Sequence, residues 1–520
     1  FILGFKFFKV KIFIASRMER LWLLLLWCSV LSVSKAKWQD IPESIKRDGF
    51  NVHIAFASQS GGLSNSTSLH VSFQTESKNC EKVEPVVSYA ECNLFSTTTV
   101  GGNWKMVSGI TESYYKQSRH HHVLLNNLKT NTFYCYRIGL KSEVTERFRN
   151  KTFILSTSRP NRKGFKFLSY GDLGLGRFSE GTIRNIVNRS LIDQVDFVMH
   201  GGDIGYGDDQ TVPFKKCGLP ALKTGPSAYE TVYDVFMNQI EPLASSIPYM
   251  VIPGNHERSC NIVSDWICPQ GMRNFSTYRK RFRMPSQLSS SDSMFYSFDY
   301  GNVHIIGINS ETDYLGAPLK PYSPIAKRAG GSFGNQTAWL EEDLKTAKNR
   351  RCHGRKLPGC YDWIIVFGHR PMYTSRRRSR ENFRRAFEPI LHKYSVDVYV
   401  GAHVHYYERV GPMFNHDKCN CETTIHKHGE IYYNPKCVVH VTNGAGGNCE
   451  GIDSRGPLLN GIGKTVSNAG YAVFTVYNSS HLKWEYYSAD SGSSLLEDSA
   501  LIVKSELVMK VMENKVSVTE

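Results

Sequence analysis

Five apolar runs in this sequence each end in a glycine-containing turn that presents side chains able to bind a metal ion. The second run leads into "HGGDIGY", which places Asp203 and Tyr206 three residues apart. A turn at this point uses the glycines and the aspartate, but it has no need of a phenol. A hard metal ion that binds both oxygens explains the pair. Over the five runs the candidate residues are Asp172, Asp203, Tyr206, Asn255, His256, His369, His403 and His405.

The residue types favour two metal ions rather than one. With His256 set aside, seven ligands remain, which is too many for one ion but gives two ions four each if Asp203 is shared. Carboxylates and a phenolate suit Fe(III), which predicts Asp172, Asp203, Tyr206 and one histidine around it. Asn255, two histidines and the shared Asp203 suit a divalent ion, which we expect to be zinc, iron or manganese. Two neighbouring ions stabilise the attacking and leaving oxygens of a phosphoryl transfer and provide hydroxide at modest pH.

The chain from Phe165 onward has the alternation of an α/β domain. Apolar runs such as "FKFLSY" and "WIIVF" predict buried strands, and residues 182–194 and 336–347 predict helices between them. Residues 294–311 are typical of a hairpin that turns at Tyr-Gly-Asn. We expect one mixed sheet, or two packed mixed sheets flanked by helices. Ligands bind at the carboxyl ends of the strands in such sheets, so the candidate side chains should meet at one edge.

Residues 40–158 contain short alternating runs separated by Ser, Thr, Asn and Gly, which predicts an antiparallel β-sandwich. Within them, "HHVLLNNLKTNTFYCYRIGL" resembles the strand-turn-strand near the end of a fibronectin type III-like domain. We expect His120–His122 to begin a strand, with metal binding as the alternative, and residues 156–164 to form a linker. The expected segments are upstream residues plus a signal peptide (1–36), the sandwich (37–158), a catalytic domain (159–505) and a charged tail (506–520).

The segment that begins at Met18 has the features of a secretory signal peptide. One arginine precedes an apolar run from Leu21 to about Val33, and small residues follow as far as Ala36. The run is short for a membrane span, so we expect no stable membrane anchor. The expected location is extracellular, with a lysosome-like compartment as the alternative, and the 13 cysteines of the chain favour disulfides. Six sequons predict N-glycosylation at Asn65, Asn150, Asn188, Asn274, Asn335 and Asn478.

The composition indicates a folded protein with a basic surface. Hydrophobic residues make up 41% of the chain and charged residues 21%, which excludes a disordered protein. The formal net charge is +16, but no nucleic-acid-binding motif accompanies it, so we expect no nucleic-acid partner. The basic surface is interpreted as a soluble surface, with attraction of anionic substrates as the alternative.

The five blocks, in this order, resemble the purple acid phosphatases of the calcineurin-like metallophosphoesterase superfamily, in the larger form with a fibronectin type III-like domain. Other superfamily members usually have Asp-x-His in the first block, where this chain has Asp172-Leu173-Gly174. They usually have a second aspartate where this chain has Tyr206. The resemblance implies that Fe(III) is bound by Asp172, Asp203, Tyr206 and His405. It implies that the divalent ion is bound by Asp203, Asn255, His369 and His403.

The resemblance also implies an activity, namely that of a secreted acid phosphatase. The expected reaction is hydrolysis of small phosphate monoesters by attack of a metal-bound hydroxide. His256 would contact the phosphate and protonate the leaving alkoxide, and Asn255 would also lie against the substrate. An unperturbed histidine is protonated below about pH 6.5, which suits an enzyme of acidic pH. Larger relatives further imply a homodimer.

One loop departs from the family pattern. Plant relatives carry histidines in the loop after the fourth block, whereas this chain has "MYTSRRRSREN" there. We expect Arg378, at a comparable offset from His369, to bind phosphate, because guanidinium groups bind phosphate oxygens well. A solvated basic loop and a protease-processing site are the alternatives.

The first rival function is that of an enzyme that has the same site but acts on another substrate. A phosphodiesterase, a nucleotidase or a sphingomyelinase-like enzyme would differ mainly in loops such as 260–284 and 316–334. A rival of another class is a binding or adhesion protein built on the sandwich. That protein should have lost metal ligands, and none is lost here. Redox chemistry at an iron pair is a third alternative.

Overall fold

The computed structural model describes residues 50–504 with internal gaps. The predicted signal segment 1–36, the tail 506–520, and the predicted sites Asn65, Asn150 and Arg378 lie outside the described residues. The gaps are 58–65, 77–83, 94–95, 100–102, 116–117, 142–145, 149–150, 159–163, 176, 193, 211–224, 262–264, 286–292, 319–332, 353–358, 377–380, 420, 427–428, 457–460 and 490–493.

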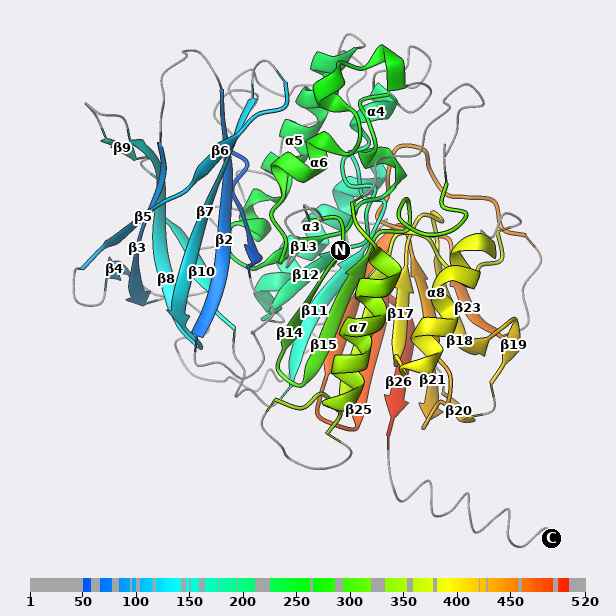
Figure 1. The fold of residues 1–520 in the computed structure, drawn as a ribbon. Helices are drawn as coiled ribbons and strands as arrows, with labels where there is room; N and C mark the ends of the chain where they lie inside the picture. The colour runs from blue at the N-terminus through cyan, green and yellow to red at the C-terminus, as the bar shows by residue number, and fades with distance from the viewer. Residues whose placement is uncertain are drawn as a thin grey trace, which may run out of the picture.

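The N-terminal region is an antiparallel β-sandwich, as its alternating runs predict (Figure 1, blue to cyan). His120–His122 lie near the start of β7, as expected, and belong to none of the potential metal-binding groups among the described residues. The first sheet has the order β1-β2-β7-β6, formed by β1 (His53–Phe56), β2 (Ser66–Glu76), β7 (Ser118–Lys129) and β6 (Ile110–Glu112). The second has the order β10-β8-β3-β4, formed by β10 (Phe153–Ser156), β8 (Phe133–Lys141), β3 (Glu84–Asn93) and β4 (Ser96–Thr99), with β5 (Lys105–Ser108) on β3 and β9 (Glu146–Phe148) on β8.

The catalytic region contains two mixed sheets, and the first supplies three of the five strand ends. In it β11, β12 and β13 run parallel, and β24 pairs antiparallel with β11. The order is β13-β12-β11-β24-β25-β26-β21-β20. The strands are β13 (Tyr249–Val251), β12 (Phe197–His200), β11 (Phe165–Tyr170), β24 (Gly470–Val476), β25 (His481–Ser488), β26 (Leu495–Val503), β21 (Gly429–Tyr433) and β20 (Glu422–His426).

The second sheet supplies the other two strand ends. Strands β15, β16, β17 and β22 are parallel, and the predicted hairpin is confirmed as β14 and β15, with Gly301 at φ 56° in its turn. The order is β14-β15-β16-β17-β22-β18-β19, with β23 on β18. The strands are β14 (Tyr296–Tyr300), β15 (Val303–Ile308), β16 (Trp363–Gly368), β17 (Val398–Gly401), β22 (Val439–Asn443), β18 (Tyr407–Phe414), β19 (Asp417–Lys418) and β23 (Ile462–Val466).

Both helices predicted from periodicity are confirmed, as α3 and α7. The longest described helix, α5, was not predicted; it begins with Pro226, which suits the first turn because proline lacks the amide proton. The helices are α3 (Arg177–Ile192), α4 (Gly207–Gln210), α5 (Pro226–Ala244), α6 (Ser276–Arg281), α7 (Gln336–Asn349) and α8 (Glu381–Lys393). Single 3-10 turns are η1 (Asn255–Glu257), η2 (Asp265–Ile267) and η3 (Gln270–Met272).

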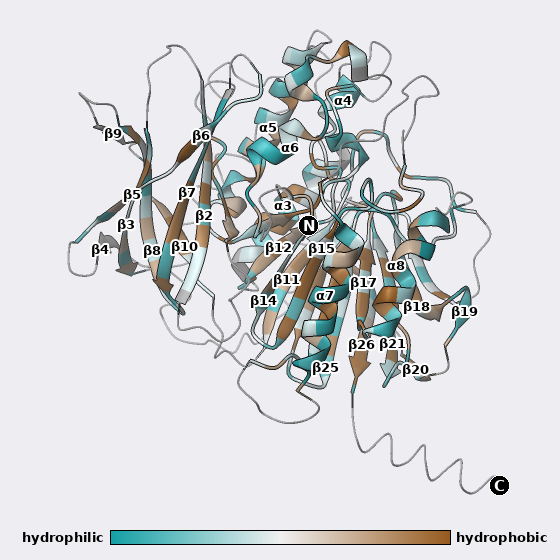
Figure 2. Ribbon diagram, viewed as in Figure 1, coloured by the Kyte–Doolittle hydropathy of each residue, from teal (hydrophilic) through white to brown (hydrophobic). Residues whose placement is uncertain are grey.

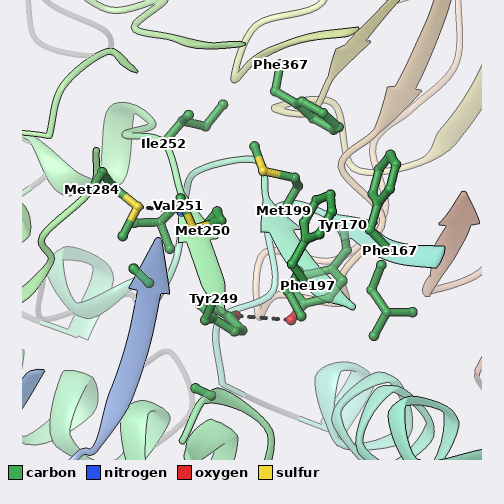
Figure 3. Close-up of a cluster of buried hydrophobic side chains, with 14 of the residues drawn as sticks. Phe167, Tyr170, Phe197, Met199, Tyr249, Met250, Val251, Ile252, Met284 and Phe367 are labelled. Atoms are coloured by element: carbon green, nitrogen blue, oxygen red, sulfur yellow. Dashed lines mark hydrogen bonds between the residues drawn. The ribbon is translucent and has the colours of Figure 1, made fainter. Parts of the chain in front are cut away.

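Aromatic side chains fill the space between the two catalytic sheets. The ring of Phe167 on β11 stacks between Phe197 and Phe474, each with its centroid 4.9 Å away, and meets Phe367 of the second sheet edge-on. Figure 3 shows several of these side chains together, with the hydrogen bond between the hydroxyls of Tyr170 and Tyr249. The strands that end at the site are strongly hydrophobic (Figure 2). A packed core of this kind holds the strand ends in fixed positions.

The sandwich packs against the catalytic domain through α5 and α6 (Figure 1). The hydroxyl of Tyr136 on β8 donates to the Ser245 carbonyl just after α5, at 2.7 Å. Buried Arg281 of α6 donates to Gln74 of the sandwich and to Glu230 of α5, at 2.9 Å in both cases. Hydrogen bonds therefore cross the contact, and one of them comes from an arginine that a buried ion pair within the catalytic domain holds in place.

Disulfides are present, as the cysteine content predicts. The pairs are Cys92–Cys135, Cys260–Cys268, Cys352–Cys360 and Cys419–Cys437, and Cys449 is also disulfide-bonded. Of the predicted glycosylation sites within the described residues, Asn274, Asn335 and Asn478 are exposed, and Asn188 is half-buried on α3. Within the part of the chain that is described, no helix is long and apolar enough to cross a membrane.

Candidate metal centre

The structure brings the predicted side chains to one edge of the two sheets. Asp172 follows β11, Asp203 and Tyr206 follow β12, and Asn255 and His256 follow β13 in η1. His369 follows β16, and both His403 and His405 follow β17. Positive φ angles, which are strained for residues other than glycine and are common at functional sites, occur at four of these positions. They are Asp172 (56°), Asp203 (51°), Tyr206 (54°) and His403 (65°).

One cluster joins Asp172, Tyr206 and His405. The Tyr206 hydroxyl lies 2.9 Å from Oδ1 of Asp172 and 3.1 Å from Nε2 of His405. Nε2 of His405 lies 3.4 Å from the same Asp172 oxygen. A phenol, a carboxylate and an imidazole thus point their ligand atoms at one another, and all three side chains are buried.

A second cluster joins Asp203, Asn255, His369 and His403. Nε2 of His369 lies 3.1 Å from Oδ2 of Asp203 and 3.3 Å from Oδ1 of Asn255. Asp203, His369 and His403 offer ligand atoms that all lie within 4.8 Å of one another. This donor set of carboxylate, amide oxygen and imidazole is one that a divalent transition metal accepts.

Main-chain carbonyls orient two of the histidines. Nδ1 of His369 lies 2.9 Å from the Gly201 carbonyl, and Nδ1 of His405 lies 3.0 Å from that of Gly451. Each Nδ1 must carry the proton and donate, because a carbonyl oxygen only accepts. In the neutral imidazole, the form that binds a metal ion, the lone pair is then on Nε2, which faces the cluster.

Glycines and a glutamate hold the carboxylates in place. A Cβ on Gly254 would lie 2.2 Å from Oδ1 of Asp203, so only glycine fits there. A Cβ on Gly444 would lie 2.8 Å from Oδ2 of Asp172. The carboxylate of Glu257 accepts the amide protons of Asp203 and Gly254, each at 2.8 Å, and so joins two loops of the site. The fixed carboxylates, together with the phenol, amide and imidazole groups around them, fit a pair of metal ions.

The buried carboxylates and imidazoles change one another's pKa values. Burial, together with Asp172 and Asp203, raises the pKa of the Tyr206 phenol well above its usual value. Burial opposes ionisation of Asp203, but His369 and His256 hold the pKa of that carboxyl below its usual value. Burial lowers the pKa of His369, yet the charge of Asp203 outweighs it and raises the pKa to about 9. A cluster of perturbed groups at a strand edge is typical of a functional site.

His256 lies beside the second cluster but is held by another carboxylate. Its Nδ1 lies 2.9 Å from Oδ1 of Asp208, and its Nε2 lies 3.8 Å from Oδ2 of Asp203. Its ring packs at 4.1 Å on the ring of Tyr206. Burial lowers the pKa of His256, but Asp208 and Asp203 outweigh burial and raise the pKa well above the usual value.

Sequence analysis missed several residues of the site. Asp208 lies in the run "YGDDQ" just after Tyr206, and a carboxylate so close to a predicted ligand was a usable signal. Arg370 and Glu311 form a buried ion pair at 2.7 Å beside the second cluster, with no comparable signal. Near the basic loop, the described residue Arg376 pairs with Asp453 at 2.8 Å.

The fold and the paired clusters define a metallophosphoesterase, and the model of the calcineurin-like phosphoesterase family matches residues 165–407. The model of the purple acid phosphatase N-terminal domain matches residues 50–152, and that of the iron/zinc purple acid phosphatase-like protein C matches residues 437–497. The chain therefore belongs to the purple acid phosphatase family. It is a metal-dependent phosphatase that acts on phosphate esters, and its family works with a dinuclear metal centre.

Curated relatives with the name acid phosphatase also match this chain, and a solved structure matches its fold. Acid phosphatase of Aspergillus ficuum is 29% identical over 483 residues, covering 74% of this chain and 75% of that protein. Acid phosphatase type 7 of Homo sapiens is 28% identical over 392 residues, covering 73% of this chain and 76% of that protein. The structure of a purple acid phosphatase from yellow lupin (Lupinus luteus) seeds matches with a TM-score of 0.64 at 20% identity, covering 88% of this chain and 74% of that one. This last match concerns the fold alone.

Proposed function

We propose that this protein is a secreted acid phosphatase that hydrolyses phosphate monoesters at a centre of Fe(III) and one divalent ion. The observation that carries the proposal is the contact of the Tyr206 hydroxyl with Asp172 and His405, at 2.9 and 3.1 Å. A phenol has no other evident reason to lie among two metal-binding residue types, and phenolate favours Fe(III). The proposed Fe(III) ligands are Asp172, Asp203, Tyr206 and His405.

The second cluster is the proposed site of the divalent ion, which is zinc, iron or manganese. Asn255 offers an amide oxygen, and His369 and His403 offer imidazole nitrogens. Asp203 lies within this cluster and on the same loop as Tyr206, so it is the proposed bridge between the ions. When bound, the two ions lower the pKa of water and neutralise the oxygens of the phosphate.

His256 is the proposed proton donor to the leaving alkoxide. Asp208 holds Nδ1 at 2.9 Å, which leaves Nε2 as the atom that faces the centre. The facing carboxylates stabilise its protonated form, as a general acid requires. Asn255, next to it in η1, is proposed to lie against the substrate as well. No covalent phosphoenzyme is needed in this scheme.

The substrate is proposed to be a monoester rather than a diester, because the curated relatives reported above bear the name acid phosphatase. The test compares hydrolysis of p-nitrophenyl phosphate and bis(p-nitrophenyl) phosphate by the purified protein between about pH 4 and pH 8. A clear preference for the monoester at the acidic end supports the proposal. A preference for the diester makes the protein a phosphodiesterase with the same centre.

A purified Asp203→Asn variant separates an enzyme from a binding protein. The enzyme should lose activity by a factor of about a hundred or more, because the proposed bridge between the ions loses its charge. A protein that functions through its sandwich would keep its function. Equal activity of this variant and the parent would contradict the proposed centre.

The proposed arrangement of the chain retains the segments 1–36, 37–158, 159–505 and 506–520. The disulfides favour an oxidising compartment, so secretion is proposed, with glycans on the exposed sequons. Peptide mass mapping before and after deglycosylation tests whether glycans are attached at Asn274, Asn335 and Asn478. Light scattering tests the proposed homodimer.

Phosphate binding by Arg378 stays a separate prediction. Arg378→Ala should raise KM for the monoester several-fold if the guanidinium binds phosphate. Unchanged KM and kcat would favour a solvated loop, and cleavage of the secreted chain within "RRRSR" would favour a processing site.

A further inference from the structure

A segment that follows β22, residues 448–453, contacts two of the proposed Fe(III) ligands through groups other than their metal-binding atoms. Asn448 is buried and donates from its main-chain amide and from its side-chain amide to the Asp172 carbonyl, at 3.2 Å in both cases. The Gly451 carbonyl accepts from Nδ1 of His405 at 3.0 Å. The segment therefore supports a carboxylate ligand and an imidazole ligand at once, and leaves Oδ1 of Asp172 and Nε2 of His405 to the centre.

Asp453, the last residue of this segment, holds His405 at its main chain. Oδ2 of Asp453 accepts from the His405 amide at 3.0 Å. The contact at the amide fixes where the side chain starts, and the contact of Nδ1 with the Gly451 carbonyl fixes the rotation of the ring. Two hydrogen bonds thus direct Nε2 towards Tyr206, whose hydroxyl lies 3.1 Å away.

Arg376 holds the Asp453 carboxylate in turn. Its Nη1 lies 2.8 Å from the same oxygen, Oδ2. The two chain segments also meet through their main chains, because the Gly456 amide donates to the Ser375 carbonyl at 3.0 Å. Arg376 belongs to the loop after the fourth block, so the ion pair connects this loop to His405 through one carboxylate oxygen.

We infer that Asp453 is a positioning residue for the iron site, because it holds the His405 amide in the place from which Nε2 reaches the Tyr206 hydroxyl. This role rests on the ligand set proposed above and goes beyond it, since Asp453 contacts a ligand and not its metal-binding atom. Removal of such a supporting partner typically changes metal affinity by about tenfold to a hundredfold. Residues 437–497 match the C-terminal model of the family, and the role of Asp453 gives that region a part in the centre.

The test starts from each purified, iron-containing protein and measures the EDTA concentration that removes half of the iron. Elemental analysis and the phenolate-to-Fe(III) band both report the iron that remains. Asp453→Ala removes the acceptor, so this EDTA concentration should fall about tenfold and the band should shift. Asp453→Asn keeps an oxygen that accepts from both the His405 amide and Arg376, so this conservative variant should behave like the parent.

Asp397→Ala is the matched control, because Asp397 makes the same two kinds of contact at the opposite end of β17. Its Oδ2 accepts from the Ile364 amide at 2.8 Å and pairs with Arg351 at 2.9 Å. Its Oδ1 also pairs with Lys504, so the control removes at least as much as Asp453→Ala does. We expect the control to lower the melting temperature and to leave iron retention and the band unchanged. Equal loss of iron from both variants would show a general loosening of the fold and would overturn the inference.

Other outcomes separate the two proposals. Unchanged iron retention and band in Asp453→Ala overturn the role of Asp453, and so does equal loss in Asp453→Asn, because charge rather than the hydrogen bond would then matter. A parent that holds no iron fails at the proposed centre itself. If Asp453→Ala does not fold, Arg376→Gln decides, since this side chain is partly exposed. We expect a smaller fall in iron retention for it, and no fall contradicts the inference.

Discussion

The carboxylate of Asp208 accepts a hydrogen bond from Nδ1 of His256 at 2.9 Å. Both side chains are buried, so the hydrogen bond is protected from competition with water. The bond fixes the orientation of the ring and leaves Nε2 facing the proposed centre. Asp208 is thus a positioning residue for the proposed proton donor.

We expect Asp208→Asn to lower kcat by about tenfold to a hundredfold, because the amide neither orients nor stabilises protonated His256 as a carboxylate does. KM and the bound metal should change little, since Asp208 is not among the proposed ligands. Steady-state kinetics with elemental analysis on the same sample gives both quantities. Asp417→Asn is the matched control, because Asp417 lies on the short, exposed strand β19. Loss of metal in Asp208→Asn would place Asp208 in the centre itself.

The visible spectrum tests the proposed role of Tyr206. The parent should show a charge-transfer band from phenolate to Fe(III), and Tyr206→Phe should lose the band. The phenylalanine ring fits the same buried space, so loss of the band would not follow from misfolding. Elemental analysis must show iron in the parent. A colourless, zinc- or manganese-loaded parent that cleaves phosphate esters would leave the centre intact and refute the role of Tyr206.

The proposed ligands could be predicted from the sequence because each lies in the turn that follows an apolar run. A buried strand is recognisable from its own residues, and its carboxyl end places the next side chain at the sheet edge. Asp172, His369 and His403 are examples, since each lies within two residues of a strand end. The sandwich and both catalytic sheets could be predicted for the same reason, although strand order could not.

The supporting residues could not be predicted, because long-range contacts define their roles. Glu311 reaches Arg370 across 59 positions of the chain, and Asp208 reaches His256 across 48. Glu257 directly follows a predicted residue, yet only the folded loops bring the Asp203 amide to its carboxylate. No local pattern separates such carboxylates from those at the surface.

Glu257→Gln should destabilise the protein and weaken the centre. The carboxylate accepts the amide protons of Asp203, Ile204 and Gly254, each at 2.8 Å. Glutamine turns one acceptor into a donor that faces another donor, which costs about 2 kcal/mol or more. Thermal unfolding should show a lower melting temperature, and metal content should fall. Glu497→Gln on β26 is the control, because this half-buried glutamate accepts a hydrogen bond from the Ser488 hydroxyl and lies on a strand away from the site. An unchanged melting temperature would show that the two loops hold together without Glu257.

His304 should stabilise the fold at acidic and neutral pH. Burial opposes its charge, but the flanking carboxylates of Asp299 and Asp343, at 2.7 and 2.8 Å, raise its pKa to about 9. Because the pKa is raised on folding, the contribution is fully present below about pH 6.5 and is lost as the pH rises through 9. Its size is about 3 kcal/mol. The difference in unfolding free energy between the parent and His304→Gln should shrink between these pH values. A constant difference would show that His304 is neutral throughout.

His53, at the interface between the domains, should make the fold less stable at acidic pH, in contrast to His304. Burial lowers the pKa of this histidine to about 4, and its ring packs at 5.1 Å on Phe282 of the catalytic domain. Its Nδ1 donates to the Asn51 carbonyl at 3.1 Å, but burial outweighs this contact and keeps the ring neutral near neutral pH. The unfolded chain takes up a proton near pH 6.5 and the folded chain does not, so stability falls by up to about 3 kcal/mol as the pH drops from 6.5 to 4. His53→Phe should remove this part of the acid sensitivity, and denaturant unfolding at a series of pH values measures it. Equal acid sensitivity of the parent and the variant would show that His53 does not contribute to it.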